Sequence, residues 1–351
     1  MSLSVHIEKR VGDFHLKINL EHEMGITGIL GASGCGKSMT LKCIAGIEKP
    51  DKGRIVLNGR VLFDSEKKIN LKPQERKVGY LFQNYALFPN MTVEQNILCG
   101  LSKEKDKGVK KEKMEAMIKV MDLASCKGLY PHQLSGGQQQ RCALARMLVS
   151  EPELLLLDEP FSALDAYLRE QLQTQVHGIL ERFGKDVLMV SHSRDEVYYL
   201  CSQTAVMHEG RVINYGKTKA VFADPKSKAA AVLTGCKNIA DAYKTGEYEV
   251  CVPDWGIRLK TEKPVREMLC AAGLRAHYFH GKARENVYPV EYLEEREDPF
   301  EFRILFRYKN QKENAPQLWW RMPKDRKPEN LPGELGIAPA NVLLLYPEEE
   351  N

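Results

Sequence analysis

The chain has 351 residues, of which 43% are hydrophobic and 28% are charged, and its formal net charge is +4. These fractions are typical of an ordinary globular protein, and the length favours two domains, the larger with a sizeable core. The mild basicity comes without a clustered basic stripe, which argues against a nucleic-acid binder. We therefore expect no nucleic-acid partner.

The cysteines and the apolar runs bear on the cellular compartment. The nine cysteines are scattered and include no Cys-x-x-Cys pair, which predicts reduced, structural thiols in the cytosol. The first ten residues lack a continuous apolar stretch, so no signal peptide is expected. No apolar run approaches the length needed to cross a bilayer. Any membrane association is therefore expected to pass through a partner protein.

Residues 1–235 show alternating strand and helix patterns. Residues 5–7 and 16–18 alternate apolar and polar side chains, which predicts antiparallel strands. The continuous apolar runs at residues 154–157 and 187–190 predict strands that are buried on both faces of a parallel sheet.

Between these strands the sequence predicts one short strand and several helices. Residues 26–30 form an apolar strand that runs into a glycine-rich turn, and a helix is expected over residues 39–45. A mostly helical subdomain is expected from about residue 90 to about residue 150, with residues 102–113 as its exposed part.

Beyond residue 236 the apolar residues repeat with the period of strands. Residues 300–308 alternate apolar and charged side chains, apart from Leu305, and predict a half-buried strand. Similar patterns occur at residues 287–292, 317–321 and 341–346. About five such short strands close most naturally into a small β-barrel. We expect this second domain to span residues 236–351, after a pattern break at residues 223–228.

The glycine-rich turn has the pattern of a phosphate-binding loop. Gly31-Ala-Ser-Gly-Cys-Gly-Lys-Ser38 follows a predicted strand and precedes a predicted helix, a context that argues against a chance match. Backbone N–H groups and the helix dipole attract phosphate oxygens, Lys37 is expected to reach the β- and γ-phosphates, and Ser38 is expected to ligate Mg²⁺. The predicted nucleotide-binding residues here are Gly31, Ala32, Ser33, Gly34, Cys35, Gly36, Lys37, Ser38 and Met39.

A second motif, Leu154-Leu-Leu-Leu-Asp-Glu-Pro160, narrows the chemistry. Its apolar residues place Asp158 at the carboxyl end of a buried strand, where ligands bind in open α/β sheets. Asp158 can hold Mg²⁺ through water, and Glu159 is placed to polarise the attacking water as a general base. The alternative is that Asp-Glu-Pro merely ends a strand.

The segment Leu134-Ser-Gly-Gly-Gln138 precedes a plausible helix and is again suited to an anion, although Ser135 could simply cap that helix. With this segment the chain resembles the ATP-binding cassette (ABC) ATPases, whose signature is Leu-Ser-Gly-Gly-Gln. The resemblance implies an α/β P-loop cassette with antiparallel β and helical subdomains. It also implies a head-to-tail dimer with a second copy, in which Ser135, Gly136, Gly137 and Gln138 close over the partner's ATP.

The resemblance assigns three further residues. Gln83 matches the glutamine that contacts Mg²⁺ or water and senses the membrane partner, and Asp165 matches the D-loop at the dimer interface. His192 matches the switch histidine that contacts the γ-phosphate, whereas a lone histidine after a strand is more often a surface or packing residue. For two residues the sequence leaves two possible roles open. Phe14 either stacks on adenine or belongs to the core, and Cys35 is either oxidation-sensitive or simply a small loop residue.

The sequence around Gln83 is most similar to importer cassettes that end in a small barrel of the TOBE or OB-like type. Among these, residues 61–64 and 234–239 look most like molybdate/sulfate-type cassettes. The resemblance implies an ATPase that uses ATP and Mg²⁺ at the cytoplasmic face of the membrane. Its partners would be integral membrane permease subunits, docked near residues 84–89, and indirectly a solute-binding protein.

The resemblance leaves the solute and the class of ATPase open. Molybdate or tungstate is the expected solute, with sulfate, a sugar or a polyamine as alternatives. A soluble ABC ATPase without a transport role, an exporter cassette and a P-loop kinase are the competing classes. The kinase is disfavoured by the signature, and the exporter by the terminal barrel.

Overall fold

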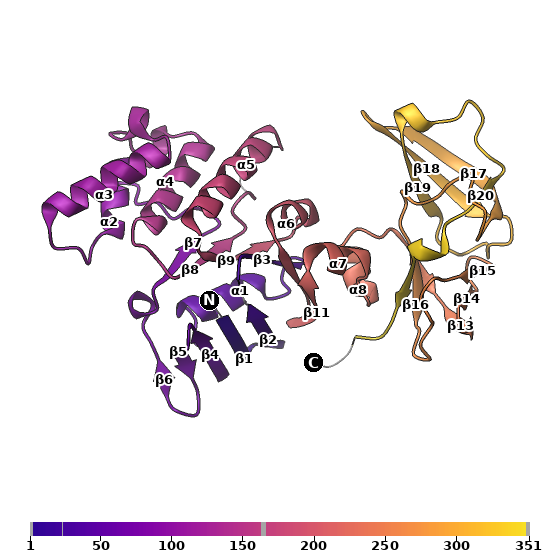
Figure 1. Cartoon of the computed structure of the whole chain (residues 1–351), viewed down its shortest axis with the longest axis horizontal. Helices are drawn as coiled ribbons and strands as arrows, with labels where there is room; N and C mark the ends of the chain where they lie inside the picture. The colour runs from indigo at the N-terminus through magenta and orange to yellow at the C-terminus, as the bar shows by residue number, and fades with distance from the viewer. Residues whose placement is uncertain (1–2, 23, 163–165, 349–351) are drawn as a thin grey trace. The chain divides into compact units, whose positions relative to one another are not determined.

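The computed structural model describes residues 3–22, 24–162 and 166–348, with only the backbone described for residues 166–168. The chain divides into two compact units, Met1–Thr218 and Lys219–Asn351 (Figure 1).

The first unit is built on one mixed sheet of eleven strands, in the order β6-β5-β4-β1-β2-β11-β10-β3-β9-β8-β7. The parallel strands are β10 (Gln203–His208), β3 (Ile26–Gly31), β9 (Asp186–Ser191), β8 (Leu154–Asp158) and β7 (Val78–Leu81). The other strands are β1 (Leu3–Val11), β2 (Phe14–His22), β4 (Lys52–Leu57), β5 (Arg60–Asp64), β6 (Ile69–Asn70) and β11 (Arg211–Lys217). The strands predicted in this unit are therefore confirmed.

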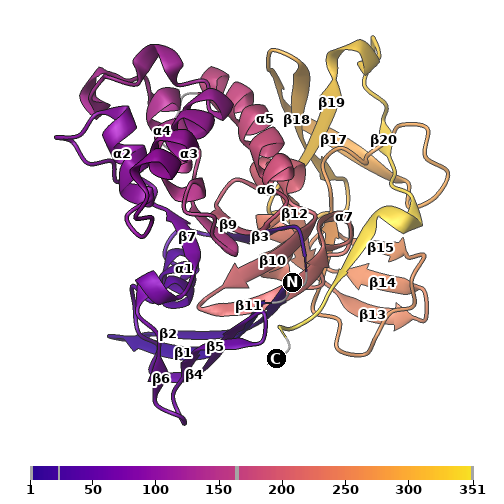
Figure 2. The same ribbon diagram turned by 60° about the vertical axis from the view of Figure 1, so that its left-hand side comes forward.

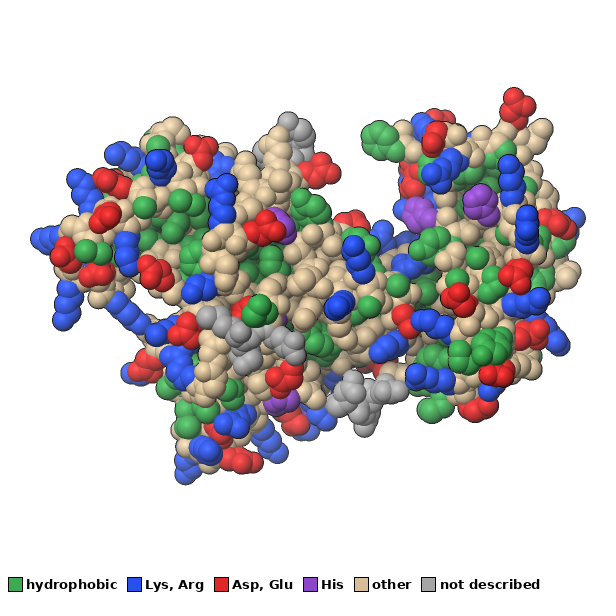
Figure 3. Space-filling view, viewed as in Figure 1, with side chains coloured by type: hydrophobic (Ala, Val, Ile, Leu, Met, Phe, Trp, Pro, Cys, Tyr) green, Lys and Arg blue, Asp and Glu red, His purple; other side chains and the backbone are tan. Residues whose placement is uncertain are grey.

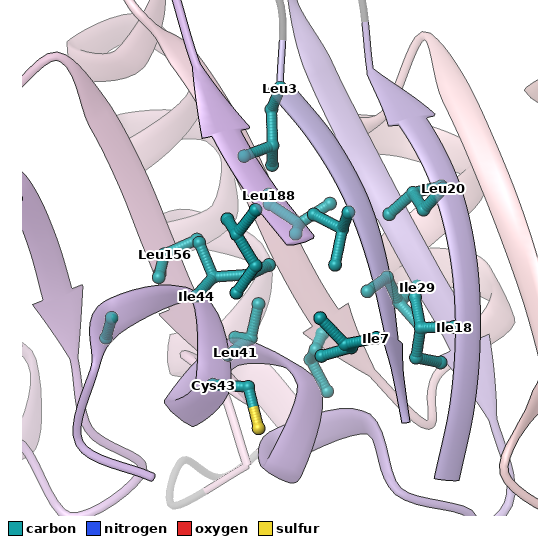
Figure 4. Packing of buried hydrophobic residues seen from close by; sticks show 14 of the residues in the cluster. Leu3, Ile7, Ile18, Leu20, Ile29, Leu41, Cys43, Ile44, Leu156 and Leu188 are labelled. Atoms are coloured by element: carbon teal, nitrogen blue, oxygen red, sulfur yellow. The ribbon is translucent and has the colours of Figure 1, made fainter. Parts of the chain in front are cut away.

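The core of the first unit forms where helix α1 (Lys37–Ala45) packs against the sheet. Figure 2 shows α1 between the antiparallel strands β1 and β2 and the parallel strands β3 and β7. Leu41 and Ile44 of α1 are fully buried and point toward Leu156 of β8 and Leu188 of β9 (Figure 4). Since α1 carries Lys37 at its first position, this packing fixes the start of the helix against the sheet.

The remaining helices of the first unit are α2 (Val93–Gly100), α3 (Lys107–Val120), α4 (Gly136–Leu148), α5 (Ala166–Phe183) and α6 (Arg194–Leu200), with short 3₁₀ turns at Pro73–Glu75, Ala124–Cys126 and Pro131–Gln133. Their starts follow from N-cap side chains that accept backbone hydrogen bonds: Thr92 for α2, Asp106 for α3 and Ser135 for α4. The predicted helical stretch is confirmed, and part of its exposed segment forms the first turns of α3.

The second unit is β-rich. Its helices are α7 (Thr218–Ala223) and α8 (Lys228–Leu233), with 3₁₀ turns at Lys324–Arg326 and Pro339–Asn341. Its strands are β12 (Asn238–Asp241), β13 (Tyr243–Gly246), β14 (Glu249–Val252), β15 (Ile257–Lys260), β16 (Ala271–Leu274), β17 (Tyr288–Glu297), β18 (Glu301–Tyr308), β19 (Leu318–Pro323), β20 (Glu334–Leu335) and β21 (Val342–Leu345). They form sheets of three, three and four strands around one core that includes Trp255 and Phe306.

Two expectations for this unit were wrong in detail. The described residues contain ten strands rather than about five, because β13, β14 and β15 are four-residue strands too short to show a clear period. Phe300, placed in the predicted strand, precedes β18 and is 87% exposed. The alternation itself is correct, since Ile304, Phe306 and Tyr308 are all buried.

The second unit begins earlier in the chain than the expected boundary after residue 235. The reason lies in α7 and α8, which pack against the strands of the second unit. Arg275 donates hydrogen bonds to the carbonyl oxygens of Phe222 and Thr234, and Ala231 packs in one cluster with Leu343. In the part of the chain that the structure describes, no helix is long and apolar enough to cross a membrane.

Candidate nucleotide site

The glycine-rich loop joins the end of β3 to the start of α1, as predicted. Gly36 has a φ of 102°, a conformation that L side chains rarely adopt. A Cβ atom on Gly31 would lie 2.5 Å from the carbonyl oxygen of Met207, so this position also admits only glycine. The glycines are therefore required by the path of the loop, which leaves its N–H groups at the start of a helix.

Lys37 is held inside the loop that carries it. Its Nζ atom donates hydrogen bonds of 2.9 Å to the carbonyl oxygens of both Gly31 and Ala32, and the residue is 5% exposed. The backbone thus curls around the ammonium group, and a cation lies at the centre of the loop. This is the geometry that a phosphate-binding loop needs.

Two alternatives left by the sequence concern Cys35, which lies in the loop, and Phe14, which lies beside it. Cys35 is 7% exposed, and burial raises the pKa of its thiol, which favours its role as a small loop residue over a reactive one. Phe14 is half-buried, packs against the core, and places its Cζ atom 3.0 Å from where a Cβ on Gly36 would lie. The Met39 side chain also packs against this core, so a nucleotide contact there would come from its backbone.

Asp158 ends β8 and holds its carboxylate between two hydroxyl groups. Ser38 Oγ donates to Oδ1 at 2.7 Å, and Tyr80 Oη donates to Oδ2 at 2.8 Å. Burial, together with the neighbouring Asp158 carboxylate, raises the pKa of Tyr80, so the phenol remains a proton donor. Sequence reasoning predicted Ser38 and Asp158 but missed Tyr80, whose only signal was its place on the strand before Gln83.

The residues around Asp158 fit a Mg²⁺ ion that is held jointly with phosphate. Among the residues that the structure describes, no group of three or more His, Cys, Asp or Glu side chains could hold a metal by itself. Mg²⁺ is commonly bound by one or two carboxylates together with substrate phosphates and water, and Ser38 with Asp158 supplies such a partial set. Gln83, the third predicted ligand, instead donates to Glu159.

Two of the predicted catalytic residues, Gln83 and His192, contact one carboxylate oxygen of the third, Glu159. Glu159 Oε2 lies 3.4 Å from Gln83 Nε2 and 3.1 Å from His192 Nδ1. Gln83 follows β7, Glu159 follows β8 and His192 follows β9, so the carboxyl ends of three adjacent parallel strands supply them. Glu159 has a φ of 45°, and its N–H donates to the carbonyl of Val190 on β9.

The signature segment begins helix α4 with a capping box. Gln138 N donates to Ser135 Oγ at 3.3 Å, and Ser135 N donates to Gln138 Oε1 at 2.9 Å, so the capping role considered for Ser135 is real. Among the described residues, no hydrogen bond joins the signature to the glycine-rich loop of the same chain. Asp165, predicted at the dimer interface, lies outside the described residues.

The loop after Gln83 has a constrained backbone. Tyr85 and Ala86 have φ values of 59° and 44°, an uncommon conformation for residues other than glycine. Arg146 in the last turn of α4 donates to the carbonyl oxygens of Tyr85 at 3.0 Å and Ala86 at 2.8 Å. Its guanidinium carbon lies 5.2 Å from the ring centre of Phe88, which is 46% exposed. The helix that begins at the signature therefore fixes this loop.

Comparisons with known proteins agree with this geometry. A family model described as ABC transporter matches residues 15–162. A probable sulfate/thiosulfate import ATP-binding protein of Chlorella vulgaris is 40% identical over 236 residues, which cover 66% of this chain and 98% of that protein. This chain belongs to the ABC transporter ATP-binding proteins. The membership confirms the predicted class of enzyme, an ABC transporter ATPase, and the import type of the relatives agrees with the predicted subfamily.

Two further relatives of this ABC protein are also import ATP-binding proteins. The sulfate/thiosulfate import ATP-binding protein CysA 2 of Chromobacterium violaceum is 39% identical over 69% of this chain, which spans only 64% of that protein's length. The molybdenum import ATP-binding protein ModC of Aliivibrio fischeri is 38% identical over 64% of this chain and 60% of its own length.

A solved structure confirms the cassette fold. The dimeric ATP-binding cassette MJ0796, in a post-hydrolysis state with ADP and Pi, is 26% identical. It covers 62% of this chain and 99% of its own, with a TM-score of 0.52.

Proposed function

We propose that this chain is the ATP-hydrolysing subunit of an ABC importer. The observation that carries the proposal is the convergence of Gln83 and His192 on the Glu159 carboxylate, one residue after Asp158. A carboxylate placed between a histidine and an amide can accept a proton from water while its neighbours hold it in position. In this proposal Glu159 is the general base, and Gln83 and His192 orient its carboxylate.

The phosphate end of the nucleotide is assigned to the glycine-rich loop. Its backbone N–H groups and Lys37 would neutralise charge on the phosphates, and Ser38 with Asp158 would hold Mg²⁺ beside them. When bound, this cation offsets the charge of the β- and γ-phosphate oxygens. Glu159 accepts the proton of the attacking water, because it follows Asp158 directly and therefore lies beside the cation site.

The active unit of the proposal is a head-to-tail dimer with a second copy. The signature has a helix N-terminus suited to an anion, and it makes no hydrogen bond to the glycine-rich loop of its own chain in the described residues. In the dimer it would meet the ATP that the partner copy holds. The dimeric assembly of the related cassette MJ0796 supports this arrangement.

The helical subdomain offers a surface for a permease. A groove of about 660 Å³ lies between α2 and α3, with an apolar floor that includes Leu98, Met114 and Ile118. Charged residues of both signs line the groove as well, namely Lys107, Lys110, Lys111, Lys127, Glu94 and Glu115, and Figure 3 shows basic and acidic side chains interspersed over the α3 region. We assign this groove, together with the exposed Phe88, to a helix of an integral membrane subunit, and a chain docked in this way would lie at the cytoplasmic face of the membrane.

The solute of the proposed importer is a tetrahedral oxyanion. The names of the Chlorella and Chromobacterium relatives favour sulfate or thiosulfate over molybdate, the solute expected from the sequence. Molybdate remains the second candidate, because the Aliivibrio relative is similar over a comparable share of the chain. A solute-binding protein would deliver either anion to the permease.

The test is the ATPase activity of the chain reconstituted with its permease and solute-binding protein. Sulfate, thiosulfate, molybdate and tungstate are titrated separately. Stimulation by sulfate or thiosulfate supports the proposal as stated, and stimulation by molybdate or tungstate alone keeps the importer and changes its solute. Steady basal hydrolysis without any anion response removes the oxyanion and leaves a sugar or a polyamine as the solute. Failure of the chain to associate with any membrane subunit contradicts the transport role and favours a soluble ABC ATPase.

A further inference from the structure

Tyr80 contacts the oxygen of the Asp158 carboxylate that Ser38 of the glycine-rich loop does not contact. Asp158 is 5% exposed, and its two oxygens accept hydrogen bonds from different elements, Oδ1 from Ser38 and Oδ2 from Tyr80. A buried carboxylate needs donors at both oxygens, since water cannot reach it freely. The Tyr80 phenol is therefore part of what holds this carboxylate in one orientation.

The sheet places Tyr80 at this position. In the parallel pair of β7 and β8, Tyr80 is aligned with Leu156, and Asp158 lies two residues further along the same face of β8. Two residues of strand correspond to about 7 Å, a step that a tyrosine side chain can reach along. The Tyr80 ring also contacts Phe82, with ring centres 4.5 Å apart. A strand, rather than a loop, thus sets the position of the phenol.

We propose that Tyr80 is a positioning residue for the Mg²⁺ that accompanies the nucleotide. It holds Oδ2 of Asp158 so that Oδ1 faces Ser38, the second group assigned to the cation. This inference rests on the proposed function, because it requires the chain to bind Mg²⁺ with ATP. The Ser38 hydroxyl is expected to turn toward the cation, and Tyr80 is then the donor that still orients Asp158.

The substitution Tyr80→Phe isolates this role. It keeps the ring, its contact with Phe82 and the strand, and it removes only the hydroxyl group. The Oδ2 atom then has no donor in a site that excludes most water, so the carboxylate loses its fixed orientation. Loss of the hydroxyl group should therefore weaken the binding of the cation. It should leave the phosphate contacts of the glycine-rich loop intact, because Tyr80 contacts Asp158 and has no hydrogen bond to that loop in the described residues.

The experiment measures binding of trinitrophenyl-ATP, a fluorescent ATP analogue, in excess EDTA and in excess MgCl₂. The ratio of the two dissociation constants is the gain in affinity that Mg²⁺ supplies. We expect Tyr80→Phe to reduce this gain by about tenfold, the size of one hydrogen bond to a charged group, and to change binding in EDTA by less than about twofold. The matched control is Tyr292→Phe, which removes a hydroxyl group that donates to Pro332 in the second unit.

The outcomes separate the inference from the function on which it rests. An unchanged gain in Tyr80→Phe overturns the positioning role, and so does an equal loss of affinity with and without Mg²⁺, which indicates general damage to the site. If the wild-type chain binds the analogue equally in EDTA and MgCl₂, the Mg²⁺ site fails as well. A gain that falls in Tyr80→Phe and stays intact in Tyr292→Phe supports the inference.

Discussion

The guanidinium group of Arg146 donates a 2.8 Å hydrogen bond to the carbonyl oxygen of Ala86. Arg146 lies in the last turn of the helix that starts at the signature, and Ala86 lies three residues after Gln83. The contact therefore joins the end of α4 to the loop that follows Gln83, and a movement of α4 would displace that loop. In the proposed dimer, this contact links the ATP of the partner copy to the catalytic residues of this one.

The first prediction concerns this contact. In Arg146→Lys the charge remains, but an ammonium group cannot donate to two carbonyls while lying over Phe88 as the planar guanidinium does. We expect the rate of ATP hydrolysis to fall by about tenfold while ATP affinity changes by less than about twofold. Steady-state kinetics, with the melting temperature as a control for folding, measure both. A lower melting temperature with an unchanged rate would show that Arg146 only stabilises the fold.

The second prediction concerns the general base. Glu159→Gln keeps the size and the contacts with Gln83 and His192 but removes the proton acceptor, so hydrolysis should fall at least about a hundredfold. ATP should still bind, and ATP-bound dimers should accumulate in size-exclusion chromatography. Glu112→Gln, on the exposed surface of α3, is the matched control. Phosphate release that continues at the wild-type rate would disprove the assignment of Glu159.

The third prediction compares two glycines of the phosphate-binding loop. Gly34 and Gly36 both have positive φ values, 80° and 102°, so alanine strains the backbone at either position. Only at Gly36 would the new Cβ also collide, with Leu16 at 2.6 Å and Met207 at 2.9 Å. We expect Gly36→Ala to weaken ATP binding by at least about tenfold more than Gly34→Ala does. Equal effects in calorimetric titrations would mean that backbone strain alone decides the outcome.

The fourth prediction concerns pH. His22 is buried, its Nδ1 lies 2.8 Å from Thr27 Oγ1, and its Nε2 lies 3.8 Å from Asp186 Oδ1. Burial lowers the pKa of His22 below its ordinary value of 6.5, and Asp186 offsets this only in part. Below pH 6.5 the unfolded chain takes up a proton here that the folded chain does not, so the free energy of unfolding falls as the pH drops. Above that pH the contribution of neutral His22 is fully present.

We therefore expect His22→Gln to lessen the pH dependence of stability. Between about pH 7.5 and about pH 5.5, the loss in free energy of unfolding should be smaller than in the wild-type chain. Urea unfolding at the two pH values measures this difference. His132→Gln, at an exposed histidine, should behave as the wild type does. The same pH dependence in all three proteins would refute the role of His22.

The sequence predicted the elements that have a strong local signal. The apolar runs that became β8 and β9 are buried along their whole length, and such runs have few other stable environments. The residues after these strands could be expected near one another, because the carboxyl ends of parallel strands meet at one edge of a sheet. Their roles came from the family resemblance, since spacing alone does not distinguish a base from a capping residue.

What could not be predicted depends on contacts between segments distant in sequence. Tyr80 and Asp158 are separated by 78 positions, and only the pairing of β7 with β8 brings them together. Arg146 and Ala86 meet across 60 positions for a similar reason. The start of the second unit also depended on packing, because the composition of α7 and α8 does not assign these helices to either unit. These contacts follow from topology, which the local pattern does not encode.

The left-handed backbone of Glu159 has a consequence for how such a site can change over time. A non-glycine residue in this conformation costs about 1 kcal/mol or more, and here the hydrogen bonds of Glu159 with Val190 and Ser162 maintain it. Glycine at this position would relieve the strain and, under the proposed role of Glu159, would also remove the carboxylate that hydrolysis requires. The proposed activity would thus maintain a strained side chain at a position whose backbone geometry favours glycine.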